Sequence, residues 1–254
     1  MKYFFAFESE LPVGSGFPLF GACHLAWLVI IVGIGIAFVR WYCRQADRMR
    51  QRTQYILGVT MPVIALYRDS VLMLTGHWGK GFLPLHLCGM ALWIAPLYIF
   101  TKRRWIGVIY VTLCVPGALG ALLFPDWNMY PLWNYMHIHA FISHGLLVIF
   151  GFALICSGEV LPRWRELYIS VLFGAAGFIG IHWINDRLHT NYWFLNVPSE
   201  GSPLTWILQA TGSKWYRTGY FIFCICVVVL WMLILQGIVV VRKWANDLAR
   251  RRHV

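Results

Sequence analysis

The chain has 254 residues, of which 12% are charged and 59% are hydrophobic. Soluble domains carry about 25% charged residues, so this composition excludes an ordinary water-soluble protein. The formal net charge is +11. Its basic residues gather in short segments between apolar runs, which argues against a nucleic-acid-binding protein and for a membrane protein.

Seven apolar runs approach the roughly 20 residues that a helix needs to cross a bilayer. They cover residues 18–39, 55–75, 83–100, 105–124, 134–156, 167–187 and 218–241. Pro84 lies at the start of the third run and leaves its limits the least defined. Because little chain remains outside the runs, the sequence predicts one polytopic domain over residues 1–254, an all-α membrane bundle of seven transmembrane helices.

Basic residues mark one side of this bundle. The first, third and fifth loops and the C-terminal tail, which begins at Arg242, hold 15 of the 21 Lys and Arg residues. The other side clearly holds Lys2, Lys80 and Lys214. The positive-inside bias therefore predicts an N-terminus outside and a C-terminus in the cytoplasm, in the cell (inner) membrane. Glu8 precedes the first apolar run, so we expect no cleavable signal peptide.

The seven cysteines lie mostly within the apolar runs and show no CxxC spacing. This pattern argues against a disulfide framework and a structural zinc site. We therefore expect neither a metal nor another cofactor.

Histidines concentrate at one depth of the bundle. Given the predicted topology, eight of nine histidines fall in the outer halves of the runs or just beyond them, and His253 falls in the tail. Ionisable groups at bilayer depth cost about 2.5–3.5 kcal/mol each on insertion scales, so they usually face the bundle interior and pair. The sequence predicts one shared polar cavity that opens toward the outer leaflet.

Helical spacing limits the chemistry of these histidines. His137 and His144 share a face about 10 Å apart, whereas His139 points about 200° away from His137, so the three cannot bind one metal from a regular helix. His182 and Asp186 are four residues apart, where the carboxylate can orient the imidazole. This pair resembles half of a catalytic dyad, and it is equally a common way to satisfy a buried histidine.

The third run begins "LPLHLC", with Pro84 before His86 and Cys88. In a regular helix Cys88 lies about 200° from His86, so the two cannot form a Cys–His pair there. Candidate catalytic residues are His86, His137, His144, His182 and Asp186. Candidate substrate-binding residues are Arg68, Asp69, Cys88, Asn185 and Asn191, although an Arg68–Asp69 ion pair between helices and a packing role for Cys88 are simpler alternatives.

The longest segment between runs covers residues 188–217. Ser202-Pro203 and Gly212 are helix start and stop signals, so a short helix is predicted between them. Trp193, Trp206 and other aromatic residues suit the headgroup layer. They form either an aromatic belt or a lid over a site.

Four stretches in order resemble the bacterial YwaF-type integral membrane family: "LPLHLC", "GALGALLFPDW", "HIHAFISHGLLV" and "NYWFLNVPSEGSPL". Its distant eukaryotic relative, transmembrane protein 164, is similar to a phospholipid acyltransferase that uses a cysteine beside a Pro/His motif. The resemblance implies a multi-helix membrane fold with a polar site at His86. Leu85 stands where the related enzyme carries its cysteine, so the resemblance does not assign a cysteine nucleophile here.

These observations favour a membrane-embedded enzyme that acts on phospholipid, an acyltransferase or hydrolase with a histidine base. Arg68 would hold a phosphate or the developing oxyanion. The alternative is a transporter or a lipid- or small-molecule-binding protein without catalysis. A zinc hydrolase would need ligands from separate helices, and a retinal protein is disfavoured because residues 218–241 contain no lysine. Membrane phospholipids are the expected partners, and the oligomeric state stays open.

Overall fold

The computed structural model describes residues 3–251, with side chains described as far as residue 240. Within these residues the chain is helical and contains no strand. Lys2, the basic tail from Arg242 onward and His253 lie outside the described side chains, so the charge pattern of the tail stays a sequence observation.

Eight α-helices follow one another along the chain. They are α1 (Ala22–Arg44), α2 (Asp47–Leu74), α3 (Leu87–Thr101), α4 (Arg104–Ile109), α5 (Val115–Leu123), α6 (Tyr135–Ser157), α7 (Leu167–Leu188) and α8 (Pro203–Arg251). A π-helix, η3 (Tyr110–Cys114), joins α4 to α5 in one continuous rod. Single 3₁₀ turns lie at Glu8–Glu10, Lys80–Phe82, Trp164–Glu166 and Tyr192–Phe194.

In the part of the chain that the structure describes, six helical stretches are long and apolar enough to cross a membrane. The exception is α3, whose 15 residues span about 22 Å, less than the roughly 30 Å hydrocarbon core. This helix is short because His86 has an extended backbone (φ −63°, ψ 146°) and only Leu87 begins the helix. The all-α membrane fold is therefore confirmed, with six long helices and a shorter apolar one where seven full spans were predicted.

The segment before the last span contains the predicted short helix. Helix α8 begins at Pro203, and Gly212 breaks its regular geometry with φ +70° and ψ 168°. Glycine is the residue that adopts this conformation without a Cβ clash. The prediction of a helix between Ser202-Pro203 and Gly212 is confirmed, and this helix continues into the last span.

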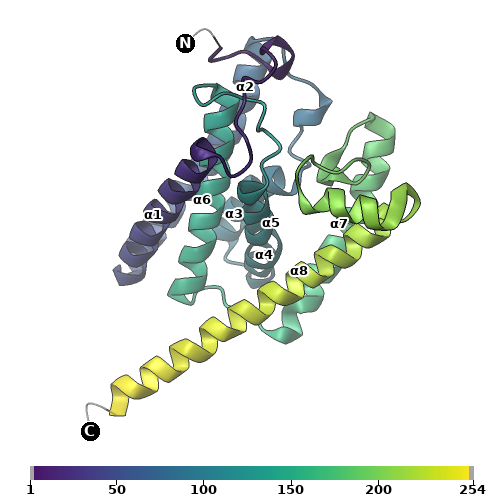
Figure 1. Cartoon of the computed structure of the whole chain (residues 1–254). Helices are drawn as coiled ribbons and strands as arrows, with labels where there is room; N and C mark the ends of the chain where they lie inside the picture. Colours follow the sequence, from purple (N-terminus) through teal and green to yellow (C-terminus); the bar gives the residue numbers. More distant parts are fainter. Residues whose placement is uncertain (1–2, 252–254) are drawn as a thin grey trace.

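The helices pack around the α4–α5 rod and α6. Helix α1 contacts α6, α2 contacts α3, and α5 contacts α6, while α8 runs obliquely across the bundle (Figure 1). Close packing of α5 on α6 requires Gly151, because a Cβ there would lie 2.2 Å from Cγ2 of Val115. The core so formed includes Tyr110, Phe141 and Phe150, all fully buried.

The π-helix leaves one buried carbonyl oxygen without a partner inside the helix. In π geometry the Val111 carbonyl would accept from the residue five positions on, but that residue is Pro116, which has no N–H. Instead, Trp231 of α8 donates its indole N–H to the Val111 oxygen at 2.9 Å. This bond satisfies a buried carbonyl and ties α8 to the central rod.

A polar network joins the C-terminal ends of α1, α3 and α6 to the first half of α2. We call it the Glu159 cluster; its members are Arg50, Tyr42, Gln54, Lys102 and Glu159. Tyr42 donates to Glu159 at 2.8 Å, and Gln54 donates to Tyr42 at 2.6 Å and also to Glu159. Lys102 donates to the Gln54 carbonyl oxygen, and Arg50 lies 3.7 Å from Glu159. Tyr42 and Gln54 are almost fully buried, so these bonds satisfy groups that water cannot reach.

Candidate functional site

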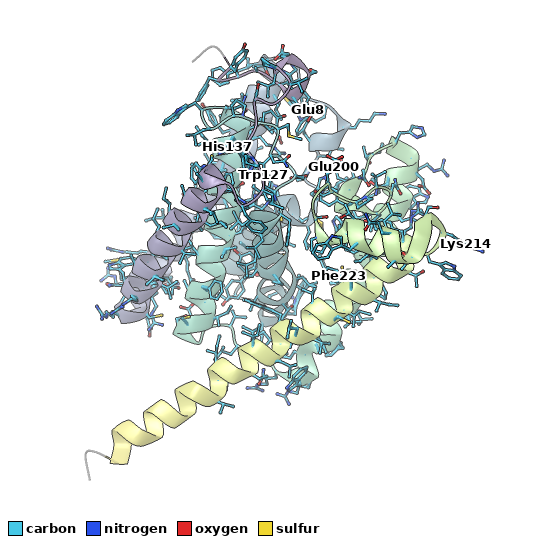
Figure 2. The ribbon with its side chains drawn as sticks, in the orientation of Figure 1. Glu8, Trp127, His137, Glu200, Lys214 and Phe223 are labelled. Carbon is cyan, nitrogen blue, oxygen red and sulfur yellow. The ribbon has the colours of Figure 1, made fainter. Side chains whose placement is uncertain are left out.

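A cavity of about 680 Å³ lies between α3, α5, α6, α7 and α8, with parts of the N-terminal segment and the loop before α6. Its polar lining includes Glu8, Arg68, His86, Cys88, Asp126, His139, Ser143, His144, Ser199 and Ser202. Its apolar lining comes largely from α5, α7 and α8, including Leu113, Leu167, Val171, Phe178, Phe223 and Val228. Glu8 and Phe223, both labelled in Figure 2, mark its extent from the N-terminal segment to α8.

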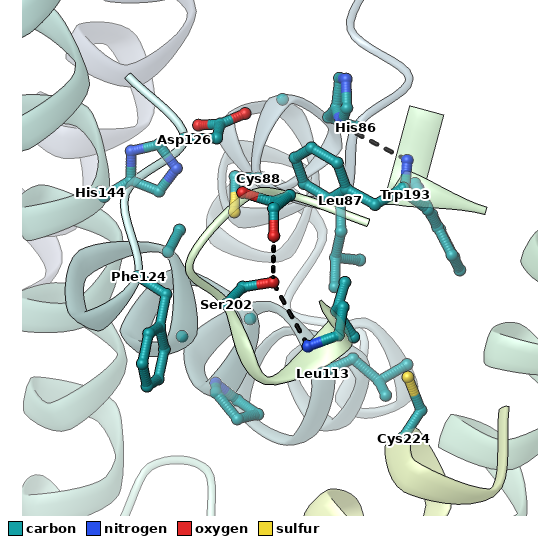
Figure 3. A pocket seen from close by; sticks show the side chains of 18 of the residues that line it. His86, Leu87, Cys88, Leu113, Phe124, Asp126, His144, Trp193, Ser202 and Cys224 are labelled. Carbon is teal, nitrogen blue, oxygen red and sulfur yellow. Dashed lines mark hydrogen bonds between the residues drawn. The ribbon is translucent and has the colours of Figure 1, made fainter. Parts of the chain in front are cut away.

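His86 lies at the cavity wall just before the first turn of α3. The backbone N–H of Trp193 donates to its Nδ1 at 3.4 Å (Figure 3). A neutral imidazole that accepts at Nδ1 carries its proton on Nε2. The ring is also held edge-on against Tyr192, with 5.1 Å between ring centroids. His86 is therefore positioned as a hydrogen-bond donor.

His144, on α6, has the opposite tautomer. Its Nδ1 lies 2.7 Å from the Ala140 carbonyl oxygen, which can only accept, so Nδ1 carries the proton. Nε2 is left with a free lone pair. The ring stacks on Trp127, with 4.8 Å between centroids and 23° between planes. A histidine with a fixed orientation and a free Nε2 has the properties of a general base.

Cys88 and Asp126 line the same cavity (Figure 3). The angular separation of about 200° applies only to two residues within one regular helix. His86 precedes the helix, so this separation does not apply to His86 and Cys88. The Cys88 thiol lies within electrostatic range of the Asp126 carboxylate. Asp126 is accessible from the cavity and surrounded by many protein atoms, and this partial burial raises the pKa of its carboxyl.

Arg68 and Asp69 form an ion pair with each other on α2, and not the ion pair between helices that was the simpler expectation. Arg68 Nη2 lies 2.6 Å from Asp69 Oδ1 and also donates to the Phe82 carbonyl oxygen at 2.7 Å. Arg68 lines the cavity, whereas Asp69 does not. The pair thus joins the end of α2 to the segment before α3 and holds one cationic side chain at the cavity wall.

His137 lies outside the cavity lining, which corrects the expectation of one site shared by all the candidate histidines. Trp27 donates to its Nε2 at 2.8 Å, and its Nδ1 lies 3.1 Å from the Tyr130 carbonyl oxygen. The side chain is fully buried between α1 and α6. With both ring nitrogens bonded, His137 has the environment of a structural histidine.

His182 and Asp186 also lie outside the cavity lining. The predicted pair forms at 3.7 Å, but His182 Nε2 also lies 3.1 Å from Arg217 Nη1. The two side chains are 38% and 57% exposed, so this pair lies at the surface of α7. The rotation of α7 about its axis, which spacing within the helix does not determine, places the pair outside.

Asn185 and Asn191 order the loop between α7 and α8. Asn185 donates to the Tyr192 carbonyl oxygen at 2.9 Å and accepts from the Tyr192 N–H at 2.8 Å. Asn191 Oδ1 accepts from the backbone of Asn196 and Val197. Neither lines the cavity, so both act on the loop rather than on a cavity ligand.

Sequence reasoning missed several residues of the cavity lining as site candidates: Asp126, Trp127, His139, Ser199 and Ser202. Asp126 and Trp127 end the stretch "GALGALLFPDW", and the two serines belong to "NYWFLNVPSEGSPL". Both stretches carry the family resemblance, which was the one signal available. Among the residues that the structure describes, no three His, Cys, Asp or Glu side chains gather as metal ligands.

Comparison with known protein families gives a match. The model of the TMEM164 family matches residues 19–235, most of the chain. No curated protein and no solved structure matches. The matched region contains the six long apolar helices up to residue 235 and the residues from α2 to α8 that line the cavity. This multi-pass membrane protein therefore belongs to the TMEM164 family.

Proposed function

We propose that the protein is a membrane-embedded acyltransferase or hydrolase that acts on phospholipid within the cavity. The observation that carries this proposal is the division of the cavity lining. One part presents histidines, a carboxylate and a guanidinium, and the rest presents apolar side chains of α5, α7 and α8. Lipids have the same division, with a polar headgroup and ester region joined to hydrocarbon chains.

The opposite tautomers of His86 and His144 suit ester chemistry. His144 Nε2 takes the proton from a water, or from the hydroxyl of an acceptor lipid, as that oxygen attacks the ester carbonyl. The carbonyl oxygen becomes an oxyanion, and His86 Nε2–H donates to it. When the tetrahedral intermediate collapses, the leaving glycerol oxygen takes the proton from His144. Water as the attacking group gives hydrolysis, and a lysophospholipid hydroxyl gives acyl transfer.

Cys88 is not needed as a nucleophile in this scheme. The thiolate is the reactive form of cysteine, and the Asp126 carboxylate near Cys88 repels a second negative charge. Arg68 is already paired with Asp69, so it contributes positive potential at the cavity wall rather than a free guanidinium.

The proposal includes the orientation of the chain. We place the N-terminus outside and the C-terminus in the cytoplasm of a bacterial YwaF-type protein in the inner membrane, with the shorter α3 as a seventh crossing. The distribution of Lys and Arg supports this orientation. The histidine-lined cavity then opens toward the outer leaflet, and phospholipids of that leaflet are its substrates.

The test is a turnover assay on the purified full-length protein in nanodiscs. A phospholipid with an isotopically labelled acyl chain is supplied with an unlabelled lysophospholipid acceptor. Mass spectrometry then follows labelled fatty acid and labelled transfer product. We expect one of these products from the wild type and a loss of about 10²–10⁴-fold in His144→Ala, which lacks the base.

A protein that binds the labelled lipid and releases neither product would contradict the catalytic proposal. That outcome would favour the alternative, a transporter or lipid-binding protein that uses the same cavity.

A further inference from the structure

The turn before α8 carries a buried hydroxyl beside the cavity. Ser199 is 8% exposed and lines the cavity. Its Oγ has no hydrogen-bond partner among the described residues. A buried polar group without a partner costs about 1–3 kcal/mol, so an unpaired hydroxyl at a cavity wall indicates a ligand that supplies the bond.

Two hydrogen bonds from Ser202 to Ser199 close this turn. The Ser199 carbonyl oxygen accepts from Ser202 Oγ at 2.6 Å and from the Ser202 N–H at 3.3 Å. Gly201 closes the turn with φ +69°. The backbone geometry is therefore determined by bonds within the turn, and the Ser199 side chain is held in place by a rigid support.

Helix α8 begins directly after this turn and ends its first straight segment before Gly212, nine residues from Pro203 to Thr211. Ser202, Pro203 and Leu204 line the cavity, so the positive end of the helix dipole faces it (Figure 3). Pro203 has no N–H, and the Thr205 N–H already donates to the Ser202 carbonyl oxygen at 3.0 Å. The Leu204 N–H has the longest bond, to Ser202 Oγ at 3.3 Å, and is the amide of this turn that a phosphate oxygen can take over. Helix starts of this kind bind phosphate oxygens.

The charges and hydrogen-bond donors of the cavity restrict which chemical group of a ligand fits it. Trp127 is 6% exposed, lines the cavity, and its Nε1 also has no partner among the described residues. An indole N–H can only donate, so the ligand has to bring acceptor oxygens. Glu8 and Asp126 line the cavity as well. Their negative charge opposes a dianionic phosphate more strongly than a singly charged phosphodiester.

We propose that Ser199 and the first turn of α8 bind the phosphodiester oxygens of a phospholipid. This inference rests on the proposed function and assigns the phosphate to a place other than Arg68. The reacting ester then extends from this turn toward His86 and His144.

The experiment measures binding of three probes to the full-length protein in detergent by intrinsic tryptophan fluorescence. The probes are dihexanoyl phosphatidylcholine, the neutral dihexanoylglycerol and inorganic phosphate. The variants are Ser199→Ala and Ser199→Asp. Ser143→Ala is the matched control, because Ser143 lines the same cavity but donates to the Ala140 carbonyl oxygen.

We expect the phosphatidylcholine to bind at least about tenfold more tightly than the diacylglycerol. Ser199→Ala should weaken the binding of phosphatidylcholine about three- to tenfold, which corresponds to the loss of one hydrogen bond. Ser199→Asp should weaken it more than about tenfold through charge repulsion. Neither change should alter diacylglycerol binding by more than about twofold. Retained diacylglycerol binding also shows that the variants are folded. Ser143→Ala should change the binding of neither lipid.

Three other results would decide against parts of this scheme. Equal binding of both lipids, unaffected by Ser199→Asp, would overturn the phosphate site and leave the lipid cavity standing. Binding of inorganic phosphate that depends on Ser199, without lipid binding, would support the phosphate site and overturn its lipid source. Absence of binding by all three probes would overturn both proposals.

Discussion

The cavity and the Glu159 cluster are two polar regions inside this bundle, and they differ in how far their polar atoms are hydrogen-bonded. In the Glu159 cluster, Gln54 and Tyr42 are buried, and Glu159 accepts from both of them. In the cavity, Ser199 Oγ and Trp127 Nε1 have no partner among the described residues. The regions lie at opposite ends of α3 and α6, the cavity near the starts of these helices.

This is the difference expected between a structural polar network and the binding site that we propose. A network whose donors and acceptors satisfy one another stabilises the helix ends that it joins and leaves nothing for a ligand. A cavity with oriented but unsatisfied groups is less stable alone and gains those bonds when a ligand binds. Changes in the cavity should therefore alter activity, and changes in the Glu159 cluster should alter stability.

The largest effect is expected from His144→Ala. Removal of the base from the cavity should lower turnover in the labelled-lipid assay by about 10²–10⁴-fold. The matched control is His182→Ala, whose side chain is 38% exposed on α7, and it should keep turnover within about threefold. If His182→Ala lost activity and His144→Ala kept it, the chemistry would have to lie at the His182–Asp186 pair instead.

The second prediction concerns a variant that breaks the Glu159 cluster. Glu159→Ala leaves the buried Tyr42 hydroxyl without its acceptor and removes one of the two acceptors of Gln54, so it should lower the free energy of unfolding by about 2 kcal/mol. Turnover of the folded protein should not change. Asp47→Ala is the control, because its pair with Arg50 involves a side chain that is 97% exposed, and surface pairs contribute at most about 1 kcal/mol. Thermal unfolding in detergent measures both; equal losses would show that the cluster contributes no more than a surface ion pair.

The third prediction concerns pH. Burial holds the pKa of Asp126 above its ordinary value of 3.8, so the folded state keeps the proton over a window in which the unfolded state releases it. Stability should therefore fall as pH rises from 3.8 through the raised pKa. Asp126→Asn should remove this part of the pH dependence, as measured by thermal unfolding between about pH 3.5 and 7. Parallel curves for wild type and variant would show that Asp126 titrates normally.

The smallest effect is expected from Cys88→Ala. Water or a lipid hydroxyl attacks the ester in the proposed scheme, so turnover should stay within about threefold of the wild type. Labelling of Cys88 by an acyl-type thiol-reactive probe, together with complete loss of turnover in the variant, would restore a covalent cysteine mechanism.

The long apolar runs and the helix start and stop signals made much of this fold predictable from the sequence. Long apolar runs predicted the six long helices, and Ser202-Pro203 with Gly212 predicted the helix that precedes the last span. The weak point was the third run, where Pro84 and the extended backbone at His86 shorten the helix. Hydropathy counts apolar residues and does not report where a helix begins.

The candidate site was predictable only in part. Arg68, His86, Cys88 and His144 all line the cavity, as the depth of their positions suggested. His182 was expected in the cavity but lies outside its lining, because the rotation of α7 about its axis depends on how the helix packs. Asp126 and Ser199 were missed because they lie in loops whose course depends on contacts distant in sequence. The chemical roles of all these residues stay predictions.

The π-helix at Tyr110–Cys114 determines which residues of α5 face the cavity. One extra residue per turn rotates everything that follows by about 100°. The small residues Pro116, Gly117, Gly120 and Ala121 face the cavity in this phase. Deletion of one residue within Tyr110–Cys114 would move each later residue back by one position, and Leu122 would then occupy the place of Ala121. The volume available to a lipid is thus determined by the helical register upstream of the wall as well as by the residues in it.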